Sequence, residues 1–190
     1  MRSLILVKHA QTVLTPDVTA ERWPLSPAGR AQCLPLAQRL APLQPTMVVA
    51  STELKAIETG QLIARQLKVP FETALGLHEH DRSNVPLVPR EQFEGHMRQF
   101  FETPHELVYG LETADEAYAR FHAAVGQVLR VYPQGPLALV THATVMALLL
   151  ARSNNRAAFD LWLELAAPSF AVVDAATFAL RELVTTIAPA

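Results

Sequence analysis

Three short apolar segments, each followed at once by polar residues, constrain the fold of this chain more than any other feature. They are residues 4–7 (Leu-Ile-Leu-Val), 47–50 (Met-Val-Val-Ala) and 137–140 (Leu-Ala-Leu-Val). An unbroken apolar run of this length is typical of a strand buried on both faces, as in the parallel sheets of α/β proteins. Ligands in open α/β sheets bind at the carboxyl ends of such strands, so the residues after these runs are the first candidates for a functional site.

Two lysines and two histidines follow the three runs. Lys8 and His9 come directly after the first, Lys55 follows the second, and His142 follows the third. A lysine and a histidine after one strand are by themselves typical of a solvated strand end, and a lone helical lysine usually lies on the surface. If the three strands are neighbours, however, their ends bring the two lysines and the two histidines together at one edge of a sheet. We expect this second arrangement.

The rest of the chain predicts helices between the strands and a hairpin near the end. Ser26 before Pro27 predicts a helix start, because serine caps the first turn and proline loses no hydrogen bond there. Ser51 is expected to cap the following helix. Gly29 indicates a close backbone approach, and Pro35 is expected to kink or end its helix. Further elements are expected as a strand over 69–75, helices over 89–101, 113–131, 144–151 and 156–165, and a hairpin of 169–174 with 177–185.

Composition excludes several classes of partner and site. The chain has 190 residues, half of them hydrophobic and 18% charged, with a net charge of −2. That balance argues against nucleic acid or an anionic membrane surface as the main partner, since both need a basic face. The one cysteine, Cys33, permits no internal disulfide and fits a cytoplasmic protein. No apolar run approaches the roughly 20 residues that span a bilayer, and the first run is too short for a signal peptide.

The residues at the strand ends resemble the motifs of the histidine phosphatase superfamily, which has the phosphoglycerate-mutase-like fold. The family's first motif, Arg-His-Gly, corresponds here to Lys8-His9-Ala10, and its second, Ser-x-x-x-Arg-Ala-x-x-Thr, corresponds to residues 51–59. The family's Leu-x-Glu corresponds to residues 77–79, and its late His-Gly corresponds to His142-Ala143. The resemblance covers essentially the whole chain. It implies an α/β protein, a three-layer α/β/α sandwich with a mostly parallel central sheet, formed as a single domain over residues 1–190.

The resemblance also implies a phosphomonoester hydrolase that works through a phosphohistidine intermediate. His9 is the expected nucleophile, Glu79 the general acid and base, and His142 a second catalytic histidine. The expected phosphate-binding residues are Lys8, Lys55, Thr12, Ser51 and Arg82. A cationic pocket suits this reaction, because a phosphomonoester dianion repels nucleophiles and its transferring oxygens carry negative charge. Neither a metal nor an organic cofactor is implied.

The chain departs from the family pattern at four positions. Lysine replaces both motif arginines, at Lys8 and Lys55, and alanine replaces both motif glycines, at Ala10 and Ala143. Lysine keeps the charge but not the planar fork by which arginine holds two phosphate oxygens. A module that binds a phosphorylated ligand without turnover is therefore an alternative. A phosphoglycerate-type mutase is a weaker alternative, because mutases of this family carry additional substrate-enclosing segments.

Residues 78–81 leave one further question open. His78, Glu79, His80 and Asp81 are all potential metal ligands, but sites built from adjacent residues are uncommon, so we expect no metal here. The expected partner is a small phosphomonoester, with no nucleic acid and no membrane. The sequence does not identify the substrate, and it leaves the oligomeric state open, a homodimer included.

Overall fold

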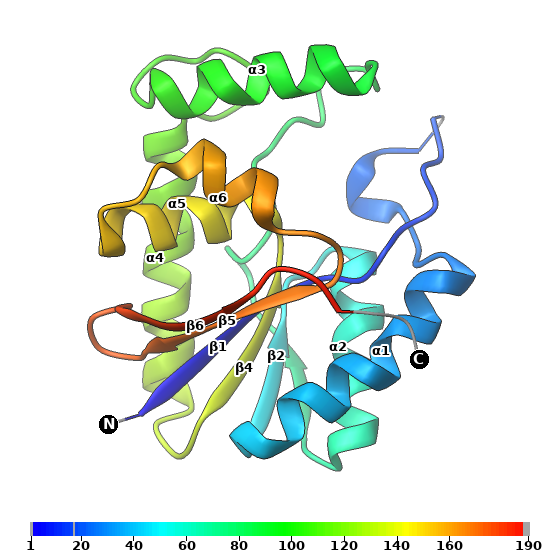
Figure 1. The fold of residues 1–190 in the computed structure, drawn as a ribbon. Coiled ribbons are helices and arrows are strands. Elements are labelled where there is room, and N and C mark those ends of the chain that lie inside the picture. The colour runs from blue at the N-terminus through cyan, green and yellow to red at the C-terminus, as the bar shows by residue number, and fades with distance from the viewer. Residues whose placement is uncertain (1, 17, 188–190) are drawn as a thin grey trace.

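The structure is a computed structural model that describes residues 2–16 and 18–187. Within these residues the centre of the fold is a sheet of six strands in the order β3-β2-β4-β1-β5-β6 (Figure 1). The strands are β1 (Ser3–Lys8), β2 (Met47–Ala50), β3 (Phe71–Thr73), β4 (Leu137–Thr141), β5 (Ser169–Asp174) and β6 (Leu180–Val184). The three apolar segments of the sequence form β1, β2 and β4, which are neighbours in the sheet.

The sheet is mostly parallel, as predicted. β1 is parallel to β4, and β2 is parallel to both β4 and β3. β5 runs antiparallel to β1, and β6 antiparallel to β5, so the predicted hairpin forms one side of the sheet. Val140 of β4 is paired with Val7 on one side and with Ala50 on the other. This register places the residues that follow the three strands at one edge.

Helices cover both faces of the sheet and complete the three predicted layers (Figure 1). Alternate residues of β1 point to opposite faces, because side chains alternate along a strand. Ile5 belongs to an apolar cluster with Ile63, while Leu6 belongs to a second cluster with Phe121. The first cluster is formed with α1 (Pro27–Leu40) and α2 (Leu54–Leu67), and the second with α4 (Ala114–Val131), α5 (Ala143–Asn154) and α6 (Ala158–Glu164).

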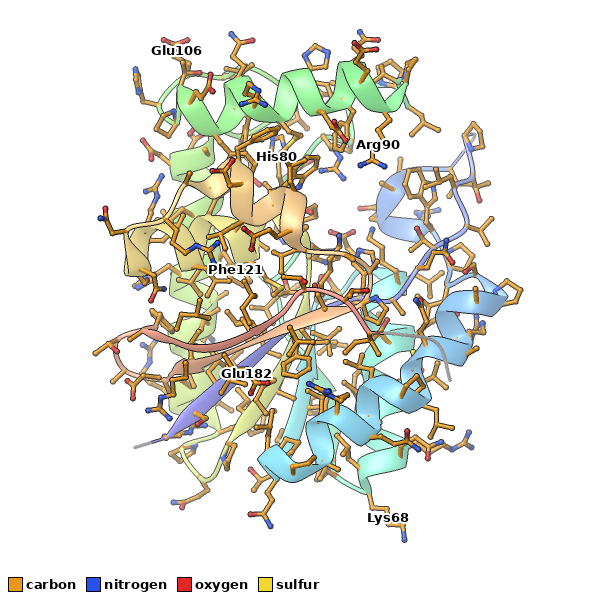
Figure 2. All side chains as sticks on the ribbon, in the orientation of Figure 1. Lys68, His80, Arg90, Glu106, Phe121 and Glu182 are labelled. Carbon is orange, nitrogen blue, oxygen red and sulfur yellow. The ribbon has the colours of Figure 1, made fainter. Side chains whose placement is uncertain are left out.

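One helix lies apart from the sheet. α3 (Arg90–Glu102) packs against α6 and crosses the top of the molecule in Figure 1. The buried Phe100 of α3 packs against the ring of His80, with 4.2 Å between the ring centroids, and His80 lies beneath α3 in Figure 2. The loop after β3 is therefore anchored to this helix. None of the described helices is both long enough and apolar enough to cross a bilayer.

The start of α1 is as predicted, and of the two effects expected of Pro35, a kink or an early end, the early end is wrong. Ser26 Oγ accepts a hydrogen bond from the Gly29 N–H at 2.9 Å. A Cβ atom at position 29 would lie 2.0 Å from the Gln11 carbonyl oxygen, so the close backbone approach requires glycine. Pro35 lies inside the helix, which continues to Leu40. The turn after the proline holds leucines that are fully buried in the core, and their burial outweighs the lost hydrogen bond.

α2 begins later than predicted, and Ser51 does not cap it. The first helical residue is Leu54 and the N-cap position is Glu53. Ser51 Oγ instead accepts from the Glu53 N–H at 3.3 Å and lies 2.9 Å from Nε2 of His142. The serine hydroxyl is thus engaged by the histidine at the end of β4 rather than by the helix.

Candidate active site

The carboxyl ends of β1 and β4 bring two of the predicted site residues together. His9 is the first residue after β1, and His142 follows β4 as the N-cap of α5. The His9 N–H donates to the Thr141 carbonyl at 3.1 Å, which continues the ladder past the strand ends. The centroids of the two imidazole rings are 5.2 Å apart. One small group bound here would face both rings.

The His9 ring is neutral and has a fixed tautomer. Its Nδ1 lies 2.8 Å from the carbonyl oxygen of Ala10, and because a carbonyl only accepts, Nδ1 carries the proton. Burial, followed by the neighbouring His142 and Lys55, holds the pKa of His9 well below its usual range. The lone pair of the ring is therefore on Nε2, where it can attack an electrophile.

The last residue of the second motif fixes the loop behind His9. The Ala10 N–H donates to Thr59 Oγ1 at 3.0 Å, and the same hydroxyl donates to the Lys55 carbonyl at 2.7 Å. Thr59 is fully buried. This bridge ties the chain after β1 to the first turns of α2, so that the His9 and Lys55 backbones are held in one arrangement.

His142 is completely buried and is held through its Nε2. That atom lies 2.9 Å from Ser51 Oγ and 3.5 Å from Glu53 Oε1. Nδ1 has no hydrogen-bond partner among the described residues. Burial, followed by the charge of Lys55, holds the pKa of His142 well below its usual range, so this ring is neutral too.

Lys8 brings a cation to the same strand end. Its Nζ donates to the carbonyl oxygen of Leu165 at 2.6 Å. Burial lowers the pKa of Lys8 to about 8, although the carboxylate of Glu79 acts in the opposite direction. The Lys8 ammonium is therefore charged at neutral pH and loses its charge under mildly alkaline conditions.

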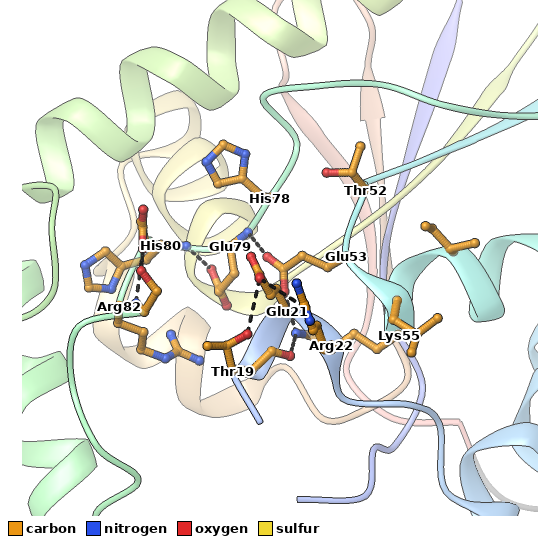
Figure 3. Close-up of a pocket in the computed structure, with 15 residues that line it drawn as sticks. Thr19, Glu21, Arg22, Thr52, Glu53, Lys55, His78, Glu79, His80 and Arg82 are labelled. Carbon is orange, nitrogen blue, oxygen red and sulfur yellow. Dashed lines mark hydrogen bonds and ion pairs between the residues drawn. The ribbon is translucent and has the colours of Figure 1, made fainter. Parts of the chain in front are cut away.

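The second predicted lysine is paired with an acid. The buried Lys55 ammonium forms an ion pair with Glu53 Oε2 and donates to the Ala20 carbonyl at 2.7 Å. The other carboxylate oxygen, Oε1, accepts from the Glu79 N–H at 2.7 Å (Figure 3). Burial alone would raise the pKa of Glu53, but Lys55 and the Glu79 N–H outweigh it and hold that pKa below its usual value. Glu53 is thus a buried carboxylate at the centre of the site.

The predicted acid, Glu79, lies on the loop after β3. One carboxylate oxygen accepts from the Thr144 N–H at the start of α5, at 3.2 Å, and the other accepts from the His80 N–H at 2.9 Å. These contacts orient the carboxylate toward the strand ends.

Arg120 of α4 holds the loop that carries Glu79. Its guanidinium donates to the carbonyl oxygens of Gly76, His78 and Glu79, at 2.9, 2.9 and 3.1 Å. It also forms an ion pair with Glu112, whose carboxylate in turn accepts from the Asp81 N–H. One partly buried guanidinium therefore fixes the backbone of residues 76–79, the loop that carries the predicted acid.

A cavity of about 750 Å³ opens onto this cluster. Its walls include the predicted residues Lys55, Glu79 and Arg82, together with Glu53 (Figure 3). Of the described residues that the sequence predicted for the site, Lys8, His9, Thr12, Ser51 and His142 are not among those that line it. Glu53 lines the cavity and also contacts the buried His142, so this side chain separates the open space from the second histidine.

A second cavity, of about 590 Å³, adjoins the first. The two share part of their walls, including Arg82, whose guanidinium lies 5.0 Å from the ring centroid of Phe93. The lining of the second cavity is mainly apolar and includes Leu14, Val18, Trp23, Val85, Leu87 and Phe93. A molecule held at the first cavity could therefore extend past Arg82 into an apolar space.

The remaining candidates lie at the margin of the site or serve the fold. Thr12 forms an isolated bridge with Leu25. His80 is buried against Phe100, and neither ring nitrogen has a hydrogen-bond partner within the part of the chain that the structure describes. Among the described residues, no three His, Cys, Asp or Glu side chains are arranged to hold a metal ion, those of residues 78–81 included.

Two residues of the site were missed by the sequence analysis. Glu53 occupies a position that the quoted motif leaves free, and its only sequence signal is an acid two residues before the motif lysine. Arg120 lies in the middle of an amphipathic helix, where an arginine is ordinarily solvated. Its role becomes visible only when the loop of residues 76–79 is placed against α4.

The comparison with protein families settles what kind of chain this is. The model of the histidine phosphatase superfamily (branch 1) matches residues 4–177. The chain belongs to the histidine phosphatase superfamily. A comparison with curated proteins finds no match.

Solved structures share the fold of this histidine phosphatase over nearly their whole length. A mycobacterial glucosyl-3-phosphoglycerate phosphatase is 20% identical, with 98% of this chain and 99% of that chain covered and a TM-score of 0.76. YhfR from Bacillus stearothermophilus is 19% identical, with 96% and 95% covered and a TM-score of 0.72. The α-ribazole phosphatase from Shigella flexneri is 16% identical, with 99% and 98% covered and a TM-score of 0.72.

Proposed function

We propose that this protein hydrolyses phosphomonoesters through a phosphohistidine formed on His9, with residues 1–190 acting as a single domain. The observation that carries the proposal is the hydrogen bond from His9 Nδ1–H to the Ala10 carbonyl. It leaves Nε2 of a neutral ring as a free nucleophile, in a site that also holds Lys8, Lys55 and a second histidine. Membership of the superfamily supports the same reaction.

In the first step, His9 Nε2 attacks phosphorus while the bond from phosphorus to the ester oxygen breaks. Covalent catalysis of this kind divides one difficult displacement into two easier ones. Lys8 and Lys55 balance the charge on the phosphoryl oxygens, and Ser51 and His142 offer hydrogen bonds from the neighbouring strand ends. Arg82 extends this charge along the cavity wall. Glu79 gives its proton to the leaving alkoxide.

In the second step, water attacks phosphorus of the phosphohistidine. Glu79, now a carboxylate, takes a proton from that water, and the bond from phosphorus to Nε2 breaks. Orthophosphate leaves, and His9 returns to its neutral form with the proton still on Nδ1. The hydrogen bonds of Glu79 to Thr144 and His80 keep the carboxylate in place through both steps. The scheme uses no metal.

The substrate that the cavities favour is a small phosphomonoester whose leaving group has an apolar part. The phosphoryl group would lie against Lys55 and Glu79 in the first cavity, and the leaving group would extend past Arg82 into the second. The phosphatases among the similar structures act on esters of small organic molecules, which fits this size class.

A second candidate function is a binding module with little turnover. The ion pair between Glu53 and Lys55 favours it, because the acid neutralises one of the two lysines on which the proposed reaction depends. The two functions differ in one measurable respect. An enzyme forms phosphohistidine and hydrolyses it, whereas a module binds the phosphorylated ligand and returns it unchanged.

Rapid-quench labelling tests the proposed function. Wild-type protein mixed with a ³²P-labelled aryl phosphate should give an acid-labile, base-stable phosphoenzyme, and H9A should give none. Steady-state turnover by H9A should fall by at least about 1000-fold. H105A, a change at an exposed histidine, is the matched control and should keep wild-type turnover. Equal activity of H9A and wild type would exclude the phosphohistidine mechanism.

A further inference from the structure

The carboxylate of Glu53 lies among the groups that the proposed function assigns to phosphate. Its Oε2 is paired with Lys55 Nζ, and its Oε1 accepts from the Glu79 N–H and lies 3.5 Å from Nε2 of His142. Two carboxylate oxygens thus contact two donor groups and lie close to a ring nitrogen of His142. A phosphoryl group presents oxygens of the same charge and hydrogen-bonding type to donors of this kind.

The charge of the first cavity points in the same direction. Besides Glu79, which gives up a proton in the proposed first step, three carboxylates line it, those of Glu21, Glu53 and Asp81, against three cations, Arg22, Lys55 and Arg82. A wall with this balance does not attract a phosphate dianion. Glu53 is the acid among them that is ion-paired with the motif lysine, and it is nearly buried, so its charge is poorly screened by solvent.

We propose that Glu53 is an internal anion that occupies the phosphate subsite at rest, and that a phosphoryl group binds there by displacing the Glu53 carboxylate from Lys55 and His142. This inference rests on the proposed function, because it concerns the same subsite. Since Glu53 must move, its displacement lowers the affinity for every phosphate by the same factor, and a ligand binds well only if its remaining part gains enough in the neighbouring cavity to offset that loss. Glu53 thus sets the affinity of the phosphate subsite and is not a group that takes part in the chemistry.

The structure offers a direct test in the binding of orthophosphate, measured by calorimetry at equilibrium. E53Q keeps the size of the side chain and an oxygen for the Glu79 N–H, but removes the charge. We expect E53Q to bind orthophosphate about 10-fold or more tightly than wild type. E21Q removes the same charge from the mouth of the cavity, where Glu21 is exposed, and should change the affinity less than threefold.

Acetate separates displacement from a supporting role of Glu53. E53A leaves a space of the shape of a carboxylate beside Lys55, so acetate should bind there and compete with orthophosphate. In wild type, where Glu53 fills the subsite, acetate at the same concentration should have no effect. Acetate that instead strengthened orthophosphate binding by E53A would mean that the carboxylate only holds Lys55 in place, and it would overturn the proposal.

The remaining outcomes distinguish this inference from the proposed function. If wild type binds and hydrolyses phosphate esters and E53Q binds orthophosphate no more tightly, only the displacement of Glu53 is wrong. If wild type, E53Q and E53A all fail to bind orthophosphate, the phosphate site itself is wrong, and the proposed function falls together with this inference.

Discussion

Lys8 should make phosphate recognition sensitive to mildly alkaline pH. Its pKa is lowered to about 8, chiefly by burial, so the ammonium is charged below that pH and becomes a neutral amine above it. Loss of the positive charge weakens the grip on the phosphoryl oxygens. With an aryl phosphate that stays a dianion throughout, we expect kcat/KM to fall about 10-fold between about pH 7 and pH 9.5.

K8R is the control for this titration. An arginine stays charged over the whole range, so the alkaline fall of kcat/KM should disappear or move to higher pH in this variant. An unchanged alkaline limb in K8R would assign the titration to another group.

Glu79 should matter most when the leaving group is poor. An alkoxide needs a proton as its bond to phosphorus breaks, whereas an aryl oxide leaves without much help. E79Q should therefore lose about 100-fold or more in kcat on an alkyl phosphate, but less than about 10-fold on an aryl phosphate. The ratio of the two losses is the measurement, and equal losses would show that Glu79 only positions the substrate.

At the scale of single residues, the sequence predicted that His9 and His142 lie close together. It did not predict that Lys55 forms an ion pair with Glu53. The apolar runs before His9 and His142 predict two strand ends, and the centroids of the two imidazole rings lie 5.2 Å apart. The pairing of Lys55 with Glu53 was not predictable. From helical spacing alone, a residue at the N-cap of α2 such as Glu53 is expected to be exposed. It is buried instead because the loop after β3 packs over it, and the Glu79 N–H on that loop donates to its carboxylate.

At the scale of elements, α4 should control the site through Arg120. R120A removes three hydrogen bonds to the backbone of residues 76–79, so the predicted acid loses its position while every group at the strand ends remains. We expect kcat to fall about 10- to 100-fold with a smaller change in KM, since a misplaced acid affects the transition state more than binding.

Two variants separate this positioning role from a loss of stability. R120K should recover only part of kcat, because lysine cannot donate to three carbonyl groups from a planar fork. R130A removes an arginine further along the same helix, in the last turn of α4, and should leave kcat unchanged. If R120A loses activity equally on alkyl and aryl phosphates, the effect does not act through Glu79.

Secondary structure was predictable where pattern and capping agreed. The strands β1, β2 and β4 and the Ser26 cap of α1 follow from local sequence. The prediction failed where tertiary contacts determine the local structure. Ser51 forms a hydrogen bond with His142 instead of capping α2, and burial of the leucines after Pro35 lets α1 continue beyond the proline. In both cases a contact distant in sequence outweighs a local preference.

At the scale of the whole molecule, the adjoining cavities should set substrate preference. An apolar leaving group gains from burial in the second cavity, at about 25 cal/mol per Å² of apolar surface. We therefore expect kcat/KM for a naphthyl phosphate to exceed that for glycerol phosphate by about 100-fold. This factor comes on top of the difference caused by leaving-group acidity, which the E79Q measurements give.

Variants of the cavity wall check this expectation. L87D places a charge in the apolar lining, and should lower kcat/KM for the naphthyl ester without affecting the glycerol ester. L163D is the matched control, because Leu163 is exposed on α6 and lines neither cavity. The three-layer architecture was predictable from the sequence, but the second cavity was not, since its wall joins residues 14–23 with residues 82–93 across the fold.

The position of β1 in the sheet has a consequence for how the chain is made. Both hydrogen-bonding neighbours of this first strand, β4 and β5, are synthesised after residue 136. Leu4, Ile5, Leu6 and Val7, which are fully buried in the finished protein, therefore leave the ribosome with no strand to pair with. For most of translation the nascent chain exposes an apolar segment of this kind, and such segments promote aggregation until they are covered. His9 gains its surroundings only when nearly the whole chain is complete.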